Sequence, residues 1–426
     1  MLDIKIIREN PELIKINSKN RLSPVDIDAL LALDVEVRNL ITEIEAARAK
    51  RNQSSKVKPT PEIIAEMKSL GESLKAKEED LLKKQAALNE MLLAVPNLTH
   101  PDVRVSDNEN DNPVLETCGA PTKFKFTPKD HVELAAALDL IDFDRATKVS
   151  GAKFYYLKNE LALMEYALIQ YALEILLKHG FTPFTTPDLA KREVLEGMGF
   201  NPRGESTQVY NIADSDLCLI GTAEITMGGF HKDEVFEESE LPKKYVAVSH
   251  CFRTEAGSYS KFSKGIFRVH QFTKIEMFQY VKPENAEKAH LEILGIEKEI
   301  FKGLGIPFQV IDHCTADLGA PSIRTYDLEA WMPGKPAADG GAGAWAEVTS
   351  TSNCTDYQSR AMNTKYKKAD GEKELVYTLN GTAIAIPRCL VAILENNQNA
   401  DGSIDIPKPL AAYMPKGYKK ITPKKK

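Results

Sequence analysis

The amino-acid sequence predicts an α+β protein, in which an antiparallel β-sheet flanked by helices follows an N-terminal arm of two antiparallel coiled-coil helices. Three observations lead to this fold class. Residues 27–95 carry apolar side chains at heptad spacing, which predicts a helical seam. A segment rich in Pro, Asn and Asp comes next. The remainder alternates short β-type runs with helical stretches, an order typical of α+β domains.

The arm is predicted as two helices with a short turn between them. Small or apolar residues recur in steps of three and four from Leu30 to Ala47, and the rhythm resumes from Ile63 to Val95. Lys77 and Lys84 fall on seam positions, so the seam is imperfect there. The second helix, about 35 residues at 1.5 Å each, would be roughly 50 Å long. An arm of that length cannot lie wholly against a compact body.

The tip of the arm is basic. Five cationic residues come with no acidic residue before Glu62, namely Arg48, Lys50, Arg51, Lys56 and Lys58. One interpretation is a solvated turn with cations for solubility. The other is a grip on RNA phosphates, which positions the RNA without reading its bases.

The rest of the chain divides by composition. We expect an N-terminal domain over residues 1–100 with the arm over 27–95, a linker over 101–128, a main domain over 129–415 and a disordered basic tail over 416–426. Within the main domain, residues 160–179 have helical period and end at Gly180, a typical helix stop.

Composition narrows the class of protein. The 426 residues are 43% hydrophobic and 27% charged, with a net charge of −6, which argues against a generally basic nucleic-acid coat. No apolar run is long enough for a membrane span, and the first residues lack a signal core. The six cysteines are scattered without a CxxC pair, so we expect a cytoplasmic protein with reduced thiols.

The most informative segment runs from Cys251 to Tyr280. Two β-rich runs joined by a polar loop predict an antiparallel hairpin. The first run ends in Phe252-Arg253-Thr254-Glu255, and the second carries Arg268, Phe272 and Glu276. Two arginines can hold phosphate oxygens by paired hydrogen bonds, while the ring can stack on a base and the carboxylate can hold an amine. The alternative interpretation is a solvated ladder of surface charges.

Two further segments carry oxygen ligands. Thr222-Ala223-Glu224 ends a strand-like run, LCLIGTAEI, where a hydroxyl and a carboxylate at a pocket floor would accept from an ammonium group. Glu347-Val348-Thr349-Ser350 offers hard oxygens at Glu347 and Ser350, which suit Mg²⁺ bridging phosphates. The plainer alternatives are a strand end whose Glu reaches solvent and a strand with outward-facing hydroxyls.

A fourth segment, LNGTAIAIPRCLVAILENNQ, covers residues 379–398. A strand ends at Asn380-Gly381, and Pro387 can open the helix that follows. Arg388 lies in the first turn, where a positive charge opposes the helix dipole, a hint that it serves a ligand. The alternative is a surface arginine.

Taken in order, these segments resemble the signature motifs of the class II aminoacyl-tRNA synthetases in their bacterial seryl form. FRTEAGS followed by GIFRVHQFTKIE resembles motif 2, residues 379–398 resemble motif 3, and TAE resembles the serine-binding segment. EVTS stands where the family has EISS. GFTPFTTPDL resembles motif 1, whose proline, here Pro187, lies at the subunit interface. The resemblance covers nearly the whole chain.

The resemblance implies ATP-dependent activation of L-serine and transfer to the 3′ end of tRNA(Ser), by a cytoplasmic homodimer of class II fold that uses Mg²⁺. The implied catalytic residues are Arg253 and Arg388. The residues that the resemblance implies for serine binding are Thr222, Ala223, Glu224, Arg253, Glu276 and Thr382. ATP binding falls to Arg253, Thr254, Glu255, Arg268, Phe272, Glu347, Val348, Thr349, Ser350 and Arg388, with Glu347 and Ser350 on the metal. The arm would grip tRNA(Ser) through its basic tip.

The chain departs from the family in motif 3, where Pro387 and Ala383 replace common glycines. The alternatives that remain open are a serine-activating ligase that loads a carrier protein, a non-catalytic RNA-binding paralogue, and a ligase for another small amino acid. Whether tRNA(Sec) is also charged is open at this point.

Overall fold

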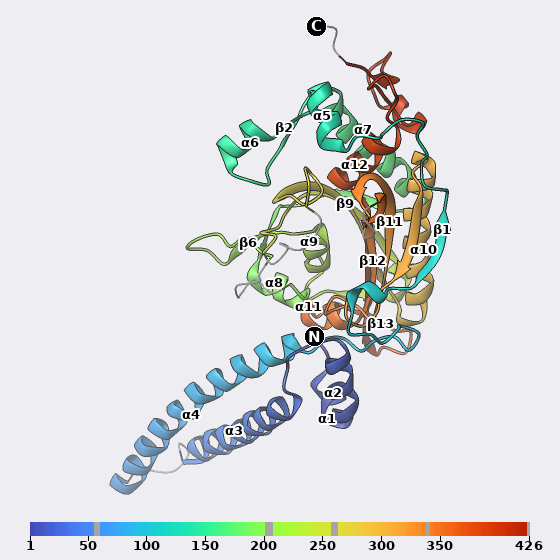
Figure 1. Cartoon of the computed structure of the whole chain (residues 1–426). Coiled ribbons are helices and arrows are strands. Elements are labelled where there is room, and N and C mark those ends of the chain that lie inside the picture. The colour runs from blue at the N-terminus through green and yellow to red at the C-terminus, as the bar shows by residue number, and fades with distance from the viewer. Residues whose placement is uncertain (55–59, 201–207, 257–262, 338–340, 424–426) are drawn as a thin grey trace. The chain divides into compact units, whose positions relative to one another are not determined.

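The computed structural model describes residues 1–54, 60–200, 208–256, 263–337 and 341–423. The chain forms two compact units, Met1–Leu98 and Thr99–Lys426 (Figure 1). Among the described residues, the protein has no helix of the length and apolarity that crossing a membrane requires.

The first unit is helical throughout. It consists of α1 (Ile4–Glu9), α2 (Pro11–Asn20), α3 (Ile27–Ser54) and α4 (Pro61–Ala94). Thr60 caps α4 by accepting from the Ile63 N–H at 3.3 Å, and Pro61 occupies the first helical position, where a missing N–H costs nothing. Late residues of α3 pair with early residues of α4, so the two helices are antiparallel, as predicted for the arm.

The seam of the arm is apolar except at its two lysines. The buried seam residues include Leu30, Val37, Ile44, Leu74 and Leu88. The two lysines reach across to glutamates of α3: Lys77 Nζ lies 2.7 Å from Glu43 and Lys84 pairs with Glu36. These exposed pairs are worth about 0–1 kcal/mol each, so the apolar contacts hold the arm together.

The second unit is built on an eight-stranded sheet of order β1-β10-β11-β12-β15-β9-β8-β4. All neighbouring pairs are antiparallel except β4–β8. In this order the strands are Val114–Cys118, Phe308–Asp312, Arg324–Pro336, Ala342–Thr355, Tyr377–Ala385, Gln271–Val281, Lys243–Phe252 and Thr182–Thr185. The predicted antiparallel sheet flanked by helices is therefore confirmed.

Three long helices bury their apolar faces in one core with the sheet. They are α7 (Asn159–Lys178), α10 (Ala286–Leu304) and α12 (Ile386–Asn396). Leu168, Ile300 and Leu390, one from each helix, are fully buried in the same cluster as Met277 of β9. Pro387 is the second residue of α12 and thus lies in its first turn, close to the helix start that the sequence predicts.

Short elements complete the second unit. The helices are α5 (His131–Leu138), α6 (Phe143–Ser150), α8 (Arg192–Gly197), α9 (Ala223–Gly229) and α11 (Tyr357–Met362). The short strands are β2 (Ile141–Asp142), β3 (Tyr156–Leu157), β5 (Leu189–Lys191), β6 (Leu217–Leu219), β7 (Val235–Glu237), β13 (Lys365–Lys367), β14 (Lys373–Leu375), β16 (Ile404–Asp405) and β17 (Lys420–Ile421). The 3₁₀ turns are Glu109–Asp111, Glu238–Glu240, Pro283–Asn285 and Lys408–Ala412.

Two predictions about irregular segments are wrong in part. The predicted linker over 101–128 contains β1, which pairs with β10 at the sheet edge. Its side chains are mostly exposed, so no apolar pattern marked it. The predicted disordered tail over 416–426 contains β17, which pairs with β16 and buries Ile421. Residues 424–426 of the tail lie outside the described residues.

Candidate active site

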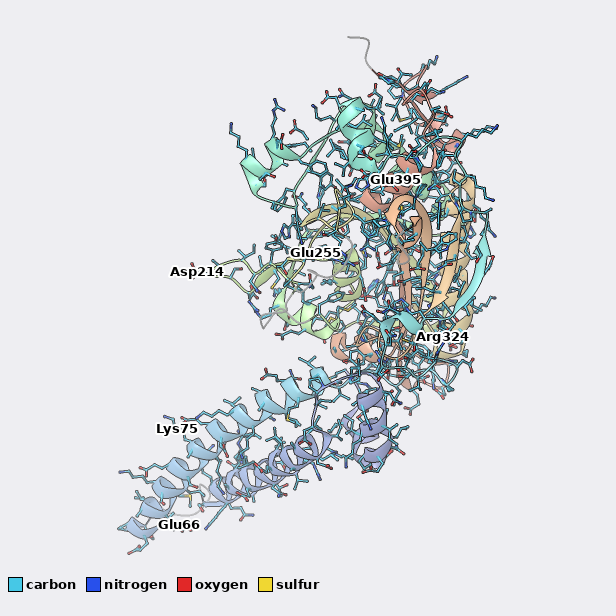
Figure 2. All side chains as sticks on the ribbon, viewed as in Figure 1. Glu66, Lys75, Asp214, Glu255, Arg324 and Glu395 are labelled. Carbon is cyan, nitrogen blue, oxygen red and sulfur yellow. The ribbon has the colours of Figure 1, made fainter. Side chains whose placement is uncertain are left out.

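A cavity of about 260 Å³ opens in the second unit between the β8–β9 hairpin, β12, β15 and the start of α12. Figure 2 labels Glu255 among the side chains of this region. Thirteen predicted site residues line the cavity: Thr222, Glu224, Arg253, Glu255, Arg268, Phe272, Glu276, Glu347, Val348, Thr349, Ser350, Thr382 and Arg388. Ala223 and Thr254 are not among the lining residues; Ala223 packs in the core instead.

The hairpin places the first arginine. The ladder of β8 and β9 ends at Phe252 opposite Gln271, and it is prolonged by the Arg253 N–H, which donates to the His270 carbonyl at 2.9 Å. The Arg253 guanidinium then lies 5.4 Å from the ring centroid of Phe272 and donates to the Gly221 carbonyl at 3.3 Å. A cation over an aromatic face is attracted by the ring electrons, so Arg253 and Phe272 hold each other in place at the cavity wall.

The second arginine of the hairpin is incompletely paired. Arg268 Nη1 is 3.4 Å from Glu255 Oε2, a long contact for an ion pair with hydrogen bonds. Within the described residues, the buried Nε of Arg268 has no hydrogen-bond partner. A buried N–H without an acceptor costs about 1–3 kcal/mol, so this end of the cavity is suited to an anion.

Thr222 and Glu224 begin a helix, whereas the sequence predicted a strand end. The strand β6 stops at Leu219, and the Thr222 hydroxyl caps α9 by accepting from the Glu224 N–H at 3.2 Å. Glu224 Oε1 accepts from Gln358 Nε2 at 2.6 Å and from Asn380 Nδ2 at 2.9 Å. Burial, with the negative charge of Glu276, raises the pKa of Glu224 to about 7.

Glu276 is held by a buried ion pair within β9 and by a hydroxyl of β15. Lys274 Nζ lies 2.6 Å from Glu276 Oε2, and all but a few per cent of both side chains is buried. Thr382, opposite Glu276 in the sheet, donates to the same carboxylate at 3.2 Å, and Lys274 Nζ lies 3.3 Å from the Thr382 hydroxyl. The three groups form a closed polar network at the cavity floor.

Glu347 and Arg388 join β12 to the start of α12. Arg388 Nη1 donates to Glu347 Oε1 at 2.7 Å and to the Glu347 carbonyl at 3.2 Å. Burial acts to raise the pKa of Glu347, but the Arg388 guanidinium outweighs it and lowers the pKa to about 2. The Glu347 side chain is 42% exposed, so a charged carboxylate faces the cavity at neutral pH.

Sequence reasoning missed several residues of the cavity. Lys274, Asn380 and Phe267 line it, and Arg388 lies 5.0 Å from the ring centroid of Phe267. Lys274 and Asn380 each stand two residues before a predicted site residue on the same strand, and residues two apart share a face. That spacing is the signal that could have found them. Gln358, on α11, had no such signal.

Two predicted sites lie outside the cavity. At the tip of the arm, Arg48 pairs with Glu78 and Lys50 with Glu66, while Arg51 is exposed. Glu66 is labelled near one end of α4 in Figure 2. Lys56 and Lys58 lie outside the described residues. Pro187, predicted at a subunit interface, is exposed between β4 and β5. In the described part of the chain, no three His, Cys, Asp or Glu side chains gather as a metal site.

The sheet and its cavity agree with a known family. Residues 209–397 match the model of the tRNA synthetase class II core domain (G, H, P, S and T). Residues 1–99 match the seryl-tRNA synthetase N-terminal domain. The fold and the cavity therefore define a class II aminoacyl-tRNA synthetase.

Comparison with similar proteins shows which class II synthetases this chain resembles. A serine–tRNA ligase of Treponema denticola is 51% identical over 420 residues, which cover 97% of this chain and 98% of the relative. One of Dictyoglomus turgidum is 48% identical over the full length of both chains. The crystal structure of seryl-tRNA synthetase from Pyrococcus horikoshii complexed with ATP superposes with a TM-score of 0.88 at 39% identity, covering 100% of both chains. The chain belongs to the seryl-tRNA synthetase family.

Proposed function

We propose that this chain activates L-serine with ATP and transfers the seryl group to the 3′ end of tRNA(Ser). One observation supports the proposal: carboxylates, a threonine hydroxyl, arginines and an aromatic ring line a single cavity. These groups suit an amine, a substrate hydroxyl, phosphates and a base. Five of these residues, Glu224, Arg253, Glu276, Thr382 and Arg388, come from distant parts of the sequence.

The first step joins two anions, because the serine carboxylate attacks the α-phosphorus of ATP and pyrophosphate leaves. Arg253 is proposed to hold the α-phosphate and the serine carboxylate together. Arg268 is proposed to hold the leaving phosphates. Phe272 and Arg388 are proposed to enclose the adenine, and Arg388 also to contact phosphate. Preorganised donors of this kind are each worth about 3–4 kcal/mol in comparable sites. In this structure Arg253 donates to the Gly221 carbonyl, and Arg268 has a long contact with Glu255.

Serine is proposed to bind with its ammonium at Glu224 and its hydroxyl at Glu276 and Thr382. A buried network that hydrogen-bonds a substrate hydroxyl rejects analogues without it by about 10⁴–10⁵, because its polar groups are then left unpaired. Alanine and glycine would be rejected in this way. Threonine would be rejected by shape.

Mg²⁺ fits the donor set at Glu347 and Ser350. Glu347 is charged at neutral pH and partly open to the cavity, and Ser350 lines the cavity beside it. One carboxylate with one hydroxyl suits a cation that also takes oxygens from substrate phosphates and water. The ion would neutralise phosphate charge during the attack. This chain's own part is to keep the Glu347 carboxylate ionised through Arg388.

The proposed partners are tRNA(Ser) and a second copy of the chain. The tip cations Arg48, Lys50 and Arg51 would grip RNA phosphates, since their exposed pairs with Glu78 and Glu66 are weak enough to be exchanged. The edge strand β4 and the exposed Pro187 would contact the partner subunit in a homodimer. The cytoplasm is the proposed compartment, because the six cysteines are all free thiols.

Two measurements test the function. Serine-dependent exchange between ATP and pyrophosphate, run against a panel of amino acids, should respond to serine and fail with alanine and glycine. Charging of total tRNA should then yield seryl-tRNA(Ser). Exchange without charging would favour a ligase that loads a carrier protein, absence of exchange would favour a non-catalytic RNA-binding paralogue, and exchange with another amino acid would reassign the substrate. Purified tRNA(Sec) in the same assay decides whether it is also a substrate.

The subunit contact has its own test. Sedimentation of the wild type should give a dimer at micromolar concentration. The variant T185E/P187E places charges on the edge strand and the proposed interface, so it should dissociate at concentrations at least tenfold higher. A monomeric wild type would remove the dimer from the proposal.

A further inference from the structure

Lys335 lies in β11, outside every motif that the sequence pointed to. Its side chain reaches over the hairpin to β12, where Nζ donates to the Trp345 carbonyl at 2.6 Å. Arg388 Nη1 donates to the Glu347 carbonyl on the same strand at 3.2 Å. Carbonyls two residues apart on a strand point to the same edge and are about 7 Å apart. The Lys335 ammonium and the Arg388 guanidinium therefore donate to neighbouring carbonyls of β12.

The electrostatics around Lys335 agree with this placement. Burial lowers the pKa of Lys335, and Arg268 and Arg388 lower it further by repulsion, while Glu329 opposes them. Glu329 is itself a weak counterion, because burial raises its pKa and its carboxylate already accepts from Gln309 Nε2 at 2.6 Å. Arg268 and Arg388 line the cavity. Lys335 is not a lining residue, but it lies near enough to both arginines for their charges to act on it.

The part of the cavity that Arg268 lines also has an unsatisfied donor. The buried Nε of Arg268 has no acceptor among the described residues. Arg388 already pairs with Glu347, whereas Arg268 has only a long contact with Glu255. A further anion near Arg268 and Lys335 would relieve the repulsion between their charges. Arg268 is the residue proposed above for the leaving phosphates of ATP.

We infer that Lys335 is a third cation for the distal phosphates of ATP and for the pyrophosphate product, beside Arg268 and Arg388. The inference rests on the proposed function. A lysine suits the task because its ammonium is a point charge on a flexible stem. In the ligand-free chain the Trp345 carbonyl holds the ammonium close by. With ATP bound, the same ammonium donates to an oxygen of the β- or γ-phosphate, which AMP does not have.

The test compares ligands that differ only in those phosphates. ATP, pyrophosphate and AMP are titrated into the full-length protein by calorimetry, with the variants Lys335→Met and Lys335→Arg. Lys335→Met should weaken ATP and pyrophosphate about tenfold, equivalent to 1.4 kcal/mol, and leave AMP unchanged. Lys335→Arg should recover most of the loss. Lys282→Met is the matched control, since Lys282 is also part-buried but pairs with Glu238 and Glu284 instead.

The outcomes separate the possible roles of Lys335. Equal weakening of ATP and AMP would make Lys335 a support of the hairpin and overturn the inference, as would unchanged ATP binding in Lys335→Met. In serine-dependent exchange, the variant should raise the KM for ATP and leave the KM for serine unchanged. A wild type that binds ATP but shows no exchange with serine would contradict the proposed function alone, since the ATP-against-AMP comparison would still stand.

Discussion

The pKa of the buried Glu224 carboxylate lies close to neutral pH. The carboxylate accepts two amide hydrogen bonds, which favour the charged form, yet burial beside Glu276 raises its pKa to about 7. A substrate ammonium at this position would tip the balance toward the carboxylate. Sequence reasoning identified Glu224 but not its partners Gln358 and Asn380, because amide side chains from distant segments carry no charge pattern that points to them.

The raised pKa predicts a pH dependence of serine binding. Below about pH 7 the substrate-free Glu224 is protonated, so binding of the serine ammonium must first release a proton. The KM for serine should therefore rise about tenfold per pH unit as the pH falls below 7, and level off above 7. Steady-state exchange from pH 5.5 to 8.5 measures this. Glu224→Gln should have a high KM at every pH; a wild-type KM that does not vary with pH would contradict the assignment.

Substitution of Thr382 tests whether this residue recognises the hydroxyl of the substrate. The Thr382 hydroxyl donates to Glu276 at 3.2 Å and lies 3.3 Å from Lys274 Nζ, so removal disturbs one network only. Thr382→Ala should raise the KM for serine about tenfold, the loss of one hydrogen bond to a charged group, and relax the rejection of alanine. Exchange rates with serine and alanine in parallel give the selectivity. Thr382→Ser, which keeps the hydroxyl, is the control, and unchanged selectivity in Thr382→Ala would count against the role.

At the scale of elements, the sequence predicted the long helices and strands that have a periodic pattern, and it missed the short edge strands. The heptad of α3 and α4 and the β8–β9 hairpin are long periodic patterns, and both are present. The strands β1 and β17 were missed because each is a short pairing on an edge, with few buried side chains to leave a pattern. The segment before Glu224 was misread as a longer strand, since the capping role of Thr222 depends on where the chain turns.

The imperfect seam of the arm gives a prediction about an element. Lys77 and Lys84 occupy seam positions but are 38% and 29% exposed and end in weak ion pairs. The variant K77L/K84L should stabilise the arm by about 1 kcal/mol per site, because added burial of apolar surface exceeds the value of an exposed pair. Hydrogen exchange of α3 and α4 amides in the full chain would slow accordingly. K75L, on the outer face of α4 (Figure 2), should leave exchange unchanged.

At the scale of the whole molecule, the proposed catalytic cavity and the proposed RNA grip belong to different units. Every residue that lines the cavity belongs to Thr99–Lys426, and the predicted RNA grip belongs to Met1–Leu98. The arm was predictable because its period extends over many turns. Which strands would meet at the cavity was not predictable. The sheet order brings β12, β15 and β9 together from segments up to about a hundred residues apart.

This division predicts that activation survives without the arm. Deletion of Asp34 to Leu88, closed by a short glycine-rich turn, should leave serine-dependent exchange within about twofold of wild type and abolish charging of tRNA(Ser), because the cavity keeps all its residues while the phosphate grip is gone.

The milder variant R48E/K50E/R51E keeps the helices and reverses charge at the tip, so it should lower charging and raise its KM for tRNA without affecting exchange. Asp34 also pairs with Arg8 inside the first unit, so the deletion alone could unfold that unit, whereas the tip variant cannot act in that way. Equal loss of exchange and charging in both variants would make the arm a structural support of the catalytic unit.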